Sequence, residues 1–580
     1  MIENTIEMQT DVLVVGSGIA GVRAAIEAKR SGLDVLLVDK SLLGRASCSV
    51  YAGGIIHPKI PEHMEKMGFQ VPNRLGLPIE RLMRKFLEEG VALGWGHPFL
   101  EDQRLMMSIA VELPVRNEEL RDFGVKDPYL QHYLGRPGLW GKDILLPMID
   151  FMIRIGVNTL EKVMITDLIR KGDSIVGAVG FGVDSGAFYI IHSKATVLAS
   201  GGGAQVYKRT YSPTRITGDG FGLAYRAGAK LWEMELIGWE NWFCVEPKCP
   251  EWWIAYSHGR MKGNLINKKG EAFFEKYARK FHCLGEKATL SLDDPIDKRY
   301  GRPIIELVHY FARASAAEIQ EGNDDKGAVL LDLSRVPEEL WTIESAGLFA
   351  LNMFRNHDWK NKPVHIAPAA EKSSGGIYIN ERCETSLTGL FAGGEVSSGS
   401  SMPFCLVTGA LAGRYASRHA HENEMIPLSK AEESYCTEKK KEIQNIVSRS
   451  PAEEGNPKDI KRVLKETMME YAGVLKSKEG LGKALEDVRG IQDERMPLLY
   501  ARTRRELREA LEVINMVTYS EMIIRSALYR EESRGLHQRL DFPEQDNKNW
   551  LKNILLEKDK GGMRLFDVPV ELVWEKPKDS

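Results

Sequence analysis

The 580-residue sequence lacks several features that would assign it to a familiar class. It has no run of about 18 apolar residues, which excludes an ordinary membrane-spanning helix. Its seven cysteines are scattered and form no C-x-x-C pair, so the usual spacing of zinc and iron–sulfur ligands is missing. The amino-terminal stretch MIENTIEMQTDVLVV has no basic segment of the kind that begins a secretory signal. We therefore expect a cytoplasmic protein with free thiols and no metal site of its own.

An excess of charge of either sign is also missing. The formal net charge is -3, which argues against a nucleic-acid partner and against general attraction to an anionic membrane. No internal repeat or low-complexity segment is present. A chain of this length exceeds one hydrophobic core, so about two to four domains are expected.

The strongest positive signal lies in the first forty residues. The apolar run DVLVV (11–15) predicts a buried parallel strand. GSGIAG follows it directly and places Gly16, Gly18 and Gly21 in G-x-G-x-x-G spacing. An Ala-rich amphipathic segment comes next, and a second apolar run, DVLLVDK, contains Asp39. This strand–glycine–helix–strand–acid order predicts a Rossmann-like dinucleotide site.

Each of these residues has a physical reason to be there. Gly16 permits a sharp turn, Gly18 lets the backbone approach a pyrophosphate, and Gly21 lets the helix pack against the strand. The helix N-terminus directs its N–H groups and dipole at the phosphates. Asp39 can accept hydrogen bonds from ribose hydroxyls, which favours an unphosphorylated ribose.

Two later segments favour FAD over NAD as the dinucleotide. VLASGGG (197–203) and LFAGGE (390–395) are both apolar strands that run into glycines, and the second ends at Glu395. Several chain segments that return to one nucleotide site are typical of FAD, which is long and usually stays bound, whereas NAD would need only one such unit. No second G-x-G-x-x-G with an acid at the right distance is present, so a separate nicotinamide domain is not expected.

Five stretches of the sequence resemble the flavoprotein subunit family of succinate dehydrogenase, fumarate reductase and L-aspartate oxidase. They are SVYAGGI (49–55), TVLASGGGAQVY (196–207), TGDGFGLAYRAGA (217–229), GLFAGGE (389–395) and YREESRGLHQRLDFPEQDNKNW (529–550). The resemblance is that of a divergent member, distantly similar to the alpha chain of adenylylsulfate reductase.

The resemblance implies how FAD is held. The helix expected at 402–420 would direct N–H groups near Cys405 and Leu406 at the flavin. Ser47 stands where some members carry the histidine that bonds covalently to FAD, so noncovalent FAD is expected. The full predicted cofactor set is Gly16, Gly18, Ile19, Ala20, Gly21, Asp39, Lys40, Arg45, Ala46, Ser47, Gly53, Gly54, Ala199, Ser200, Gly201, Asp219, Glu395, Cys405 and Leu406.

The sequence departs from the family at four positions that bind dicarboxylate substrates or move protons. Glu240 and Glu371 occupy the places of two histidines, Ser400 that of a carboxylate-binding arginine, and Val308 that of the proton-shuttle arginine. A buried carboxylate without cationic partners costs several kcal/mol. Succinate, fumarate and aspartate are therefore not expected as substrates at the usual site.

Four side chains are the candidates for acid–base chemistry: Glu240, Glu371, His309 and Lys372. Each also has a structural interpretation. Glu240 could be a solvated loop acid, Glu371 could pair with Lys372, and His309 could be a hydrogen-bonded core histidine. Several tryptophans in the same region favour a less charged, unsaturated or aromatic substrate.

The hypothesis is an FAD-dependent oxidoreductase that moves a hydride between flavin N5 and a small organic substrate, with reduction or formation of a C–C double bond. An iron–sulfur, ferredoxin-like protein would exchange electrons with it. The alternatives are an electron-relay subunit without its own substrate, sulfur chemistry like that of adenylylsulfate reductase, and an oxidase that uses O2.

The expected fold class is α/β, with a Rossmann-like FAD-binding domain, an inserted α+β capping domain and a C-terminal helical domain. The first part of the FAD-binding domain spans 1–235, with a helical insertion at about 60–140. The capping domain spans 236–362, and the second FAD-binding part spans 363–425. Residues 426–580 form Lys- and Glu-rich helices and a β-like tail.

Overall fold

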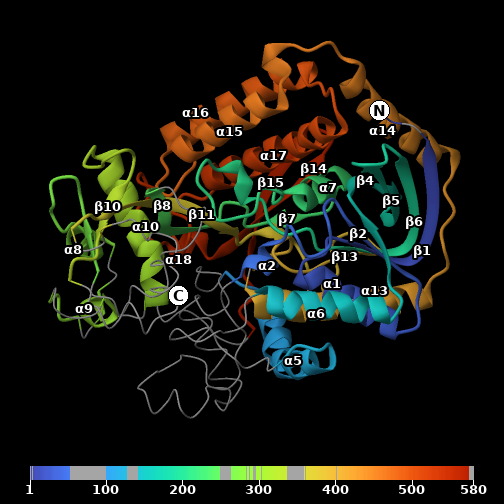
Figure 1. The fold of residues 1–580 in the computed structure, drawn as a ribbon, viewed down its shortest axis with the longest axis horizontal. Coiled ribbons are helices and arrows are strands. Elements are labelled where there is room, and N and C mark those ends of the chain that lie inside the picture. Colours follow the sequence, from blue (N-terminus) through green and yellow to red (C-terminus); the bar gives the residue numbers. More distant parts are fainter. Residues whose placement is uncertain are drawn as a thin grey trace.

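The structure is a computed structural model of the chain, and three sheets organise it (Figure 1). It describes residues 2, 4–52, 100–126, 141–247, 263–281, 284–285, 288–291, 296–301, 304–335, 358, 361–399 and 401–573. Among these residues, no helix combines the length and apolar character needed to cross a membrane.

The first sheet is the frame of the amino-terminal half. Its strands are β1 (Thr5–Val15), β2 (Val35–Asp39), β3 (Asn158–Glu161), β4 (Val163–Lys171), β5 (Ser174–Gly182), β6 (Phe188–Leu198) and β13 (Leu390–Ala392). They follow the order β3-β2-β1-β6-β5-β4, and β13 pairs with β6. The strands β3, β2, β1, β6 and β13 run parallel, as the apolar runs predict for strands covered on both faces.

Two helices that are far apart in sequence pack closely on this sheet. They are α1 (Ile19–Arg30) and α13 (Met402–Glu422). A Cβ on Gly409 would lie 2.4 Å from the Ala20 carbonyl oxygen, and one on Gly413 would lie 2.5 Å from that of Ala24. Only glycine allows this separation, because real Cβ atoms do not approach backbone so closely.

Further helices surround the first sheet. They are α2 (Cys48–Tyr51), α5 (Gln103–Asp122), α6 (Gly141–Arg154) and α7 (Asp219–Ala227), with the short helix η1 (Ala204–Val206). The helix α5 lies within the segment predicted as a helical insertion, whereas residues 53–99 and 127–140 are outside the described ranges.

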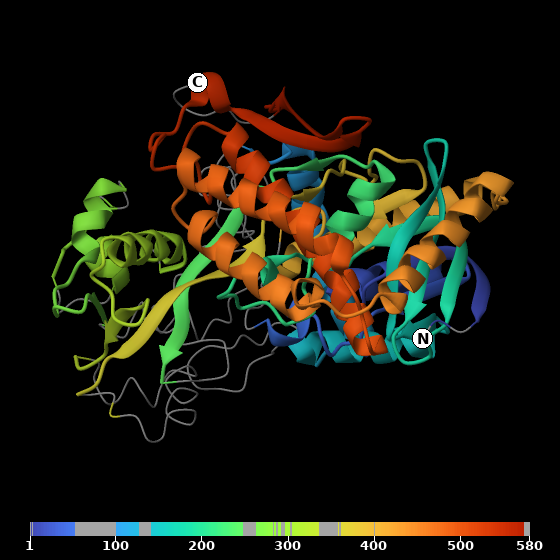
Figure 2. The ribbon, with the colours of Figure 1, turned by 90° about the horizontal axis from the view of Figure 1, so that it is seen from above.

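A second, antiparallel sheet stands at one side of the molecule (Figures 1 and 2). Its strands follow the order β8 (Ile237–Glu246), β11 (Val364–Ser373), β10 (Val329–Asp332) and β9 (Asn264–Ile266). The helices α8 (Phe274–Lys280), α9 (Ile296–Tyr300) and α10 (Ile304–Gln320) accompany it. The unit has the α+β composition expected of the capping domain. Its strand β11 lies within the predicted second FAD-binding part, which begins at 363, and yet it pairs with β8 of this sheet along its length.

The carboxyl-terminal part is mainly helical. Its helices are α14 (Lys430–Ser448), α15 (Pro457–Tyr471), α16 (Lys478–Gly490), α17 (Arg504–Tyr529) and α18 (Asn547–Trp550), with short turns at Glu453–Gly455, Ile491–Arg495 and Met496–Leu498. A third sheet follows the order β12 (Gly376–Ile377), β7 (Leu231–Trp232), β14 (Lys552–Asp559) and β15 (Gly562–Pro569). The tail is thus a hairpin joined to strands of the central region, and the predicted fold class is confirmed.

Candidate functional site

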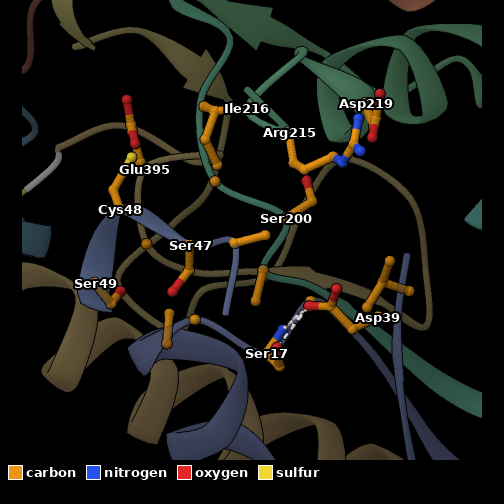
Figure 3. A pocket seen from close by; sticks show the side chains of 18 of the residues that line it. Ser17, Asp39, Ser47, Cys48, Ser49, Ser200, Arg215, Ile216, Asp219 and Glu395 are labelled. Atoms are coloured by element: carbon orange, nitrogen blue, oxygen red, sulfur yellow. Dashed lines mark hydrogen bonds between the residues drawn. The ribbon is translucent and has the colours of Figure 1, made fainter. Parts of the chain in front are cut away.

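A deep pocket opens at the carboxyl ends of β1, β2, β6 and β13 (Figure 3). This edge is where parallel α/β sheets bind nucleotides. The pocket contains about 1050 Å³ of space not filled by protein atoms, including solvent at its mouth. Its lining residues come from four separate segments, within 15–52, 163–165, 199–223 and 393–405, as the sequence predicted for FAD.

The glycine loop after β1 is shaped by direct backbone contact. Gly16 has a positive φ of 109°, and a Cβ there would lie 2.4 Å from the Ala199 carbonyl oxygen. A Cβ on Gly21 would lie 1.9 Å from the Gly16 carbonyl oxygen. The helix α1 therefore begins directly against the strand end, with its N-terminus at the pocket. The Ser49 hydroxyl accepts a hydrogen bond from the Ile19 N–H at 3.1 Å.

Asp39 is fixed at the end of β2 by two neighbouring serines. Its Oδ2 accepts hydrogen bonds from the Ser17 backbone N–H (2.9 Å) and the Ser17 hydroxyl (2.6 Å), as the dashed lines in Figure 3 show. Its Oδ1 accepts from the Ser41 N–H at 2.7 Å. The carboxylate is thus held in one orientation beside the glycine loop, which is what a ribose acceptor requires.

Lys40 ties the pocket to the carboxyl-terminal helices. Its Nζ lies 2.6 Å from Asp219 Oδ2 and 3.1 Å from Glu512 Oε1 on α17. Burial opposes the ammonium charge, but the two carboxylates outweigh it and raise the pKa of Lys40. Asn515, also on α17, donates to Asp219 Oδ1 at 2.9 Å. Asp219 therefore lines the pocket while it is bound by the protein itself.

Two hydroxyl groups in the pocket wall have no hydrogen-bond partner within the described part of the chain. They are the buried Oγ atoms of Ser47 and Ser200. Buried polar atoms are normally satisfied, so orphaned hydroxyls in a cavity indicate a polar ligand. Together with the glycine loop and Asp39, they fit a dinucleotide with many polar atoms.

Most of the predicted cofactor residues line the pocket. These are Gly16, Gly18, Ile19, Ala20, Asp39, Lys40, Ala46, Ser47, Ala199, Ser200, Gly201, Asp219, Glu395 and Cys405. Gly21 lies one layer behind, where it packs α1 on β1. Gly53 and Gly54 fall outside the described residues.

Three predicted details differ in the structure. Arg45 is exposed and does not line the pocket, and Leu406 is fully buried in the core behind it. The Cys405 N–H donates to the Ser401 carbonyl at 3.0 Å, so it is engaged within α13. The helix is capped at Ser401, whose hydroxyl accepts from the Phe404 N–H at 3.3 Å, and Pro403 has no N–H to offer. The Cys405 N–H does not point at a ligand as predicted, because α13 begins earlier and uses this N–H in its own first turn.

The structure also adds pocket residues that the sequence argument omitted. Arg215, which stands just before the TGDG stretch, is the most polar of them, and Cys48 adds a thiol beside Ser47. Val163, Met164 and Ile165 contribute an apolar wall from β4. In the sequence, only their closeness to the motifs TGDG and SVYAGGI could have indicated that Arg215 and Cys48 line the pocket.

Three of the candidate acid–base residues lie on the capping sheet, on β8 and β11, and His309 lies on α10, which packs against that sheet. Glu240 lies on β8 opposite Ala369 of β11, is 7% exposed, and is therefore not a solvated loop acid. Lys372 Nζ lies 3.1 Å from Glu371 Oε2, so the pairing considered for Glu371 is present. The Lys372 stem runs over Gly238, where a Cβ would lie 2.7 Å from its Cγ.

His309 is held as a core histidine. Its Nδ1 lies 2.8 Å from the Trp239 carbonyl oxygen. Burial, with help from the nearby charge of Lys372, lowers the pKa of His309 to about 4. The ring is thus neutral near neutral pH and cannot serve there as a cationic proton donor. Val308 beside it is buried, whereas Ser400 lies outside the described residues.

The capping sheet touches the pocket through a short polar link. The Ser212 hydroxyl donates to the Glu371 carbonyl at 3.3 Å and lies 3.9 Å from the Cys48 thiol, which lines the pocket. On α10, Arg313 donates to the Gly535 carbonyl and covers the Tyr310 ring at 4.8 Å. The Glu371–Lys372 segment therefore lies one hydrogen bond away from a residue that contacts the pocket wall.

Comparison with known protein families gives three matches along the chain. The FAD binding domain family matches residues 116–409, and the fumarate reductase flavoprotein C-terminal family matches residues 461–579. The FAD dependent oxidoreductase family matches residues 11–105.

Individual proteins match over nearly the full length. An uncharacterized FAD-dependent oxidoreductase of Methanocaldococcus jannaschii is 28% identical over 97% of this chain and 99% of its own. A component of the CoM/CoB fumarate reductase of Methanothermobacter marburgensis is 29% identical over 95% of this chain and 97% of its own. A solved quinol–fumarate reductase superposes with a TM-score of 0.82 at 22% identity, covering 99% of this chain and 100% of that one.

Proposed function

The chain belongs to the FAD-binding flavoprotein family of fumarate reductase and succinate dehydrogenase as a divergent member, and from this premise we propose that it moves a hydride between flavin N5 and a small organic substrate. It is an FAD-dependent oxidoreductase. The proposed reaction forms or reduces a C–C double bond. The observation that carries the proposal is the Glu371–Lys372 pair, which stands beside the pocket at the edge of the cap.

The pocket residues fit FAD. Gly16, Gly18 and the start of α1 would hold the pyrophosphate, and Asp39 would hold the ribose. The unpaired hydroxyls of Ser47 and Ser200 would bind polar atoms of the cofactor. Bound FAD supplies the hydride acceptor or donor of the reaction. With serine at position 47, we propose noncovalent attachment.

A dicarboxylate does not suit the cap residues. Glu240 is buried on β8, and Glu371 lies nearby on the neighbouring strand β11. The Glu371 carboxylate would repel a substrate with two carboxylates, and Lys372, the cation beside it, is already paired with Glu371. A substrate with at most one negative charge fits this arrangement better. We therefore propose that succinate and fumarate are poor substrates.

The second proton of the reaction would pass through the acidic and basic side chains of the cap. Removing or adding hydride at carbon leaves a charge that an acid or base must neutralise. Glu371 and Lys372 can exchange a proton within their 3.1 Å pair, and Glu240 is a second candidate. His309 is better suited to position Trp239, because its ring is neutral and bonded to that backbone.

Electrons would leave or enter through another protein. The Methanothermobacter relative is one subunit of a fumarate reductase, which supports a multi-protein arrangement. The sequence itself offers no cluster-type cysteine spacing and no second dinucleotide motif. An iron–sulfur partner is therefore the proposed electron carrier.

The experiment is a reoxidation test on the photoreduced holoprotein. Bleached flavin that is restored by one member of a panel of enoates or enoyl thioesters supports the proposal. Restoration only by a ferredoxin-like protein would establish the relay alternative, and rapid restoration by air would establish an oxidase. Succinate-dependent dye reduction at an ordinary rate would contradict the substrate argument. Acid precipitation should release the flavin into solution.

Variants of the ion pair test which residues act. Glu371→Gln combined with Lys372→Met should lower kcat by about 100-fold or more, because acid–base groups contribute about 10²- to 10⁴-fold. Glu246→Gln with Lys326→Met removes an exposed acid–lysine pair next to the same sheet and is the control. Equal activity of both double variants would exclude Glu371 and Lys372 from the chemistry.

A further inference from the structure

Glu395 occupies an unusual position in the wall of the FAD pocket. It follows β13 and the glycines Gly393 and Gly394, and its side chain is 8% exposed. Figure 3 places it beside Cys48, at the end of the pocket away from Asp39. Because Asp39 marks the ribose end, the Glu395 end is the one left for the flavin.

The fold makes room specifically for this carboxyl group. A Cβ on Gly202 would lie 2.1 Å from Glu395 Oε1, and one on Gly203 would lie 2.4 Å from the Tyr519 ring. The Ser373 N–H donates to Glu395 Oε1 at 3.0 Å, and the Ser373 hydroxyl bonds the Tyr519 hydroxyl at 2.6 Å. The triple glycine of the sequence therefore accommodates Glu395 and the tyrosine behind it.

The carboxyl group lacks a compensating cation. Within the described ranges Glu395 forms no ion pair, and its hydrogen bonds come from backbone N–H groups of Ser373 and Gly202. Burial, reinforced by the charge of Glu371, raises the pKa of Glu395 to about 7. Lys372 opposes this effect, and it is already paired with Glu371.

Among the residues that the structure describes, the other titratable groups that act on Glu395 or are acted on by it come from three helices, and none of these three groups is cationic. They are Cys48 of α2, Cys405 of α13 and Tyr519 of α17. Burial raises the pKa of both thiols, which therefore remain protonated at neutral pH. Burial raises the pKa of Tyr519 as well, so its hydroxyl is neutral.

Of the described residues, two cations do line the pocket, but Lys40 is paired with Asp219 and Glu512, and Arg215 lies 3.8 Å from Glu512 and beside Asp219 (Figure 3). Negative charge added at the Glu395 end of the pocket is therefore offset chiefly by a proton on Glu395.

Both binding and reduction of the cofactor add negative charge. FAD carries two phosphate charges, and the reduced flavin carries more negative charge than the oxidised flavin. Like charge in a buried site favours the protonated carboxyl group. We propose that Glu395 takes up a proton when the bound FAD is reduced and releases it when the flavin is reoxidised.

The proton and electron balance is simple. Two electrons and one proton reach the flavin, either together as a hydride or as electrons from a chemical reductant with a proton from solvent, and a second proton passes from solvent to the Glu395 carboxylate. When an electron carrier reoxidises the flavin, both protons return to solvent. When the flavin gives a hydride to a substrate, its own proton leaves with that hydride and Glu395 releases only the second proton. The inference depends on FAD binding and not on the proposed substrate.

The test is the pH dependence of the flavin midpoint potential in dithionite titrations of the holoprotein. For a two-electron couple, each further proton adds a slope of about 30 mV per pH unit. We expect this additional slope in the native protein above about pH 7, because below that pH Glu395 holds its proton in both redox states. Glu395→Gln should lose the additional slope, and Glu424→Gln, an exposed acid beyond α13, should keep it.

A second measurement needs no variant and guards against loss of FAD from Glu395→Gln. The reduced-minus-oxidised infrared difference spectrum of the native protein above pH 7 should gain the carbonyl band of a protonated carboxylic acid. Proton uptake on flavin reduction, measured with an indicator dye, should be one proton per two electrons below about pH 7 and two protons per two electrons above it. Parallel potential slopes in all three proteins, or absence of the carboxylic acid band, would overturn the proposal.

Discussion

Asp39 shows how much one side chain contributes to cofactor binding. Its carboxylate is oriented by Ser17 and Ser41 before any ligand arrives. Asp39→Asn should weaken FAD binding by about 10- to 100-fold, since a hydrogen bond to a charged group contributes about 1.5–3 kcal/mol. Flavin fluorescence titration of the apoprotein measures the dissociation constant.

The control for this change is Asp34→Asn. Asp34 lies just before β2, is exposed, and binds the Asn158 side chain, so its amide variant should bind FAD normally. If Asp39→Asn bound FAD as tightly as Asp34→Asn does, the ribose assignment of Asp39 would be wrong.

At the scale of secondary-structure elements, α1 and α13 pack closely, and the first residues of both helices line the pocket. Gly413→Ala should lower the free energy of unfolding by about 1–3 kcal/mol, because its Cβ would meet the Ala24 backbone at 2.5 Å. Thermal unfolding monitored by circular dichroism gives the change.

The matched substitution is Gly482→Ala on α16, where an added Cβ meets nothing within 4 Å. Alanine there should raise stability by about 0.5–1 kcal/mol through its higher helix propensity. The two variants thus change stability in opposite directions, and a loss of stability in both would contradict the packing argument.

At the scale of the whole molecule, one buried ion cluster joins the middle of the chain to its carboxyl-terminal part. Arg530, which is fully buried, donates to Glu235 at 2.7 Å and to Glu532 at 3.0 Å, and lies 3.3 Å from Glu233. Arg530→Met should reduce stability by about 3–5 kcal/mol, because it leaves buried carboxylates uncompensated. Thermal unfolding measures the loss.

The comparison is Arg418→Met, which removes an exposed pair with Glu422. Exposed pairs contribute little, so its unfolding temperature should match that of the native protein. Similar unfolding temperatures for both variants would show that the Arg530 cluster does not hold the molecule together.

Local patterns predicted much of the fold. The strand–glycine–helix–strand order, the helices after residue 426 and the α+β character of the cap all depend on short-range periodicity and turn residues. The predicted strand at 11–15 begins earlier, at Thr5, because pairing with β6 extends it. The proposed domain division remains a prediction, although β11 joins the capping sheet across one of its boundaries.

The sequence predicted those site residues that belong to a motif with a fixed spacing. Gly16, Gly18 and Asp39 line the pocket because their spacing reflects the backbone path around a phosphate. Arg45 and Leu406 could not be placed, since the direction of a side chain from a loop or a helix start depends on distant packing. Arg215 was missed for the same reason.

The sequence alone determined the dinucleotide fold and FAD as cofactor, because the glycine loop and the acid after it are residue types at a fixed spacing. It also predicted that the dicarboxylate-binding residues of the family are replaced in this chain. Only the tertiary structure decided that Glu371 pairs with Lys372, that His309 is neutral, and that Glu395 has no cationic partner among the residues that the structure describes. Protonation depends on burial and on neighbours from other segments, and no single stretch of sequence contains that information.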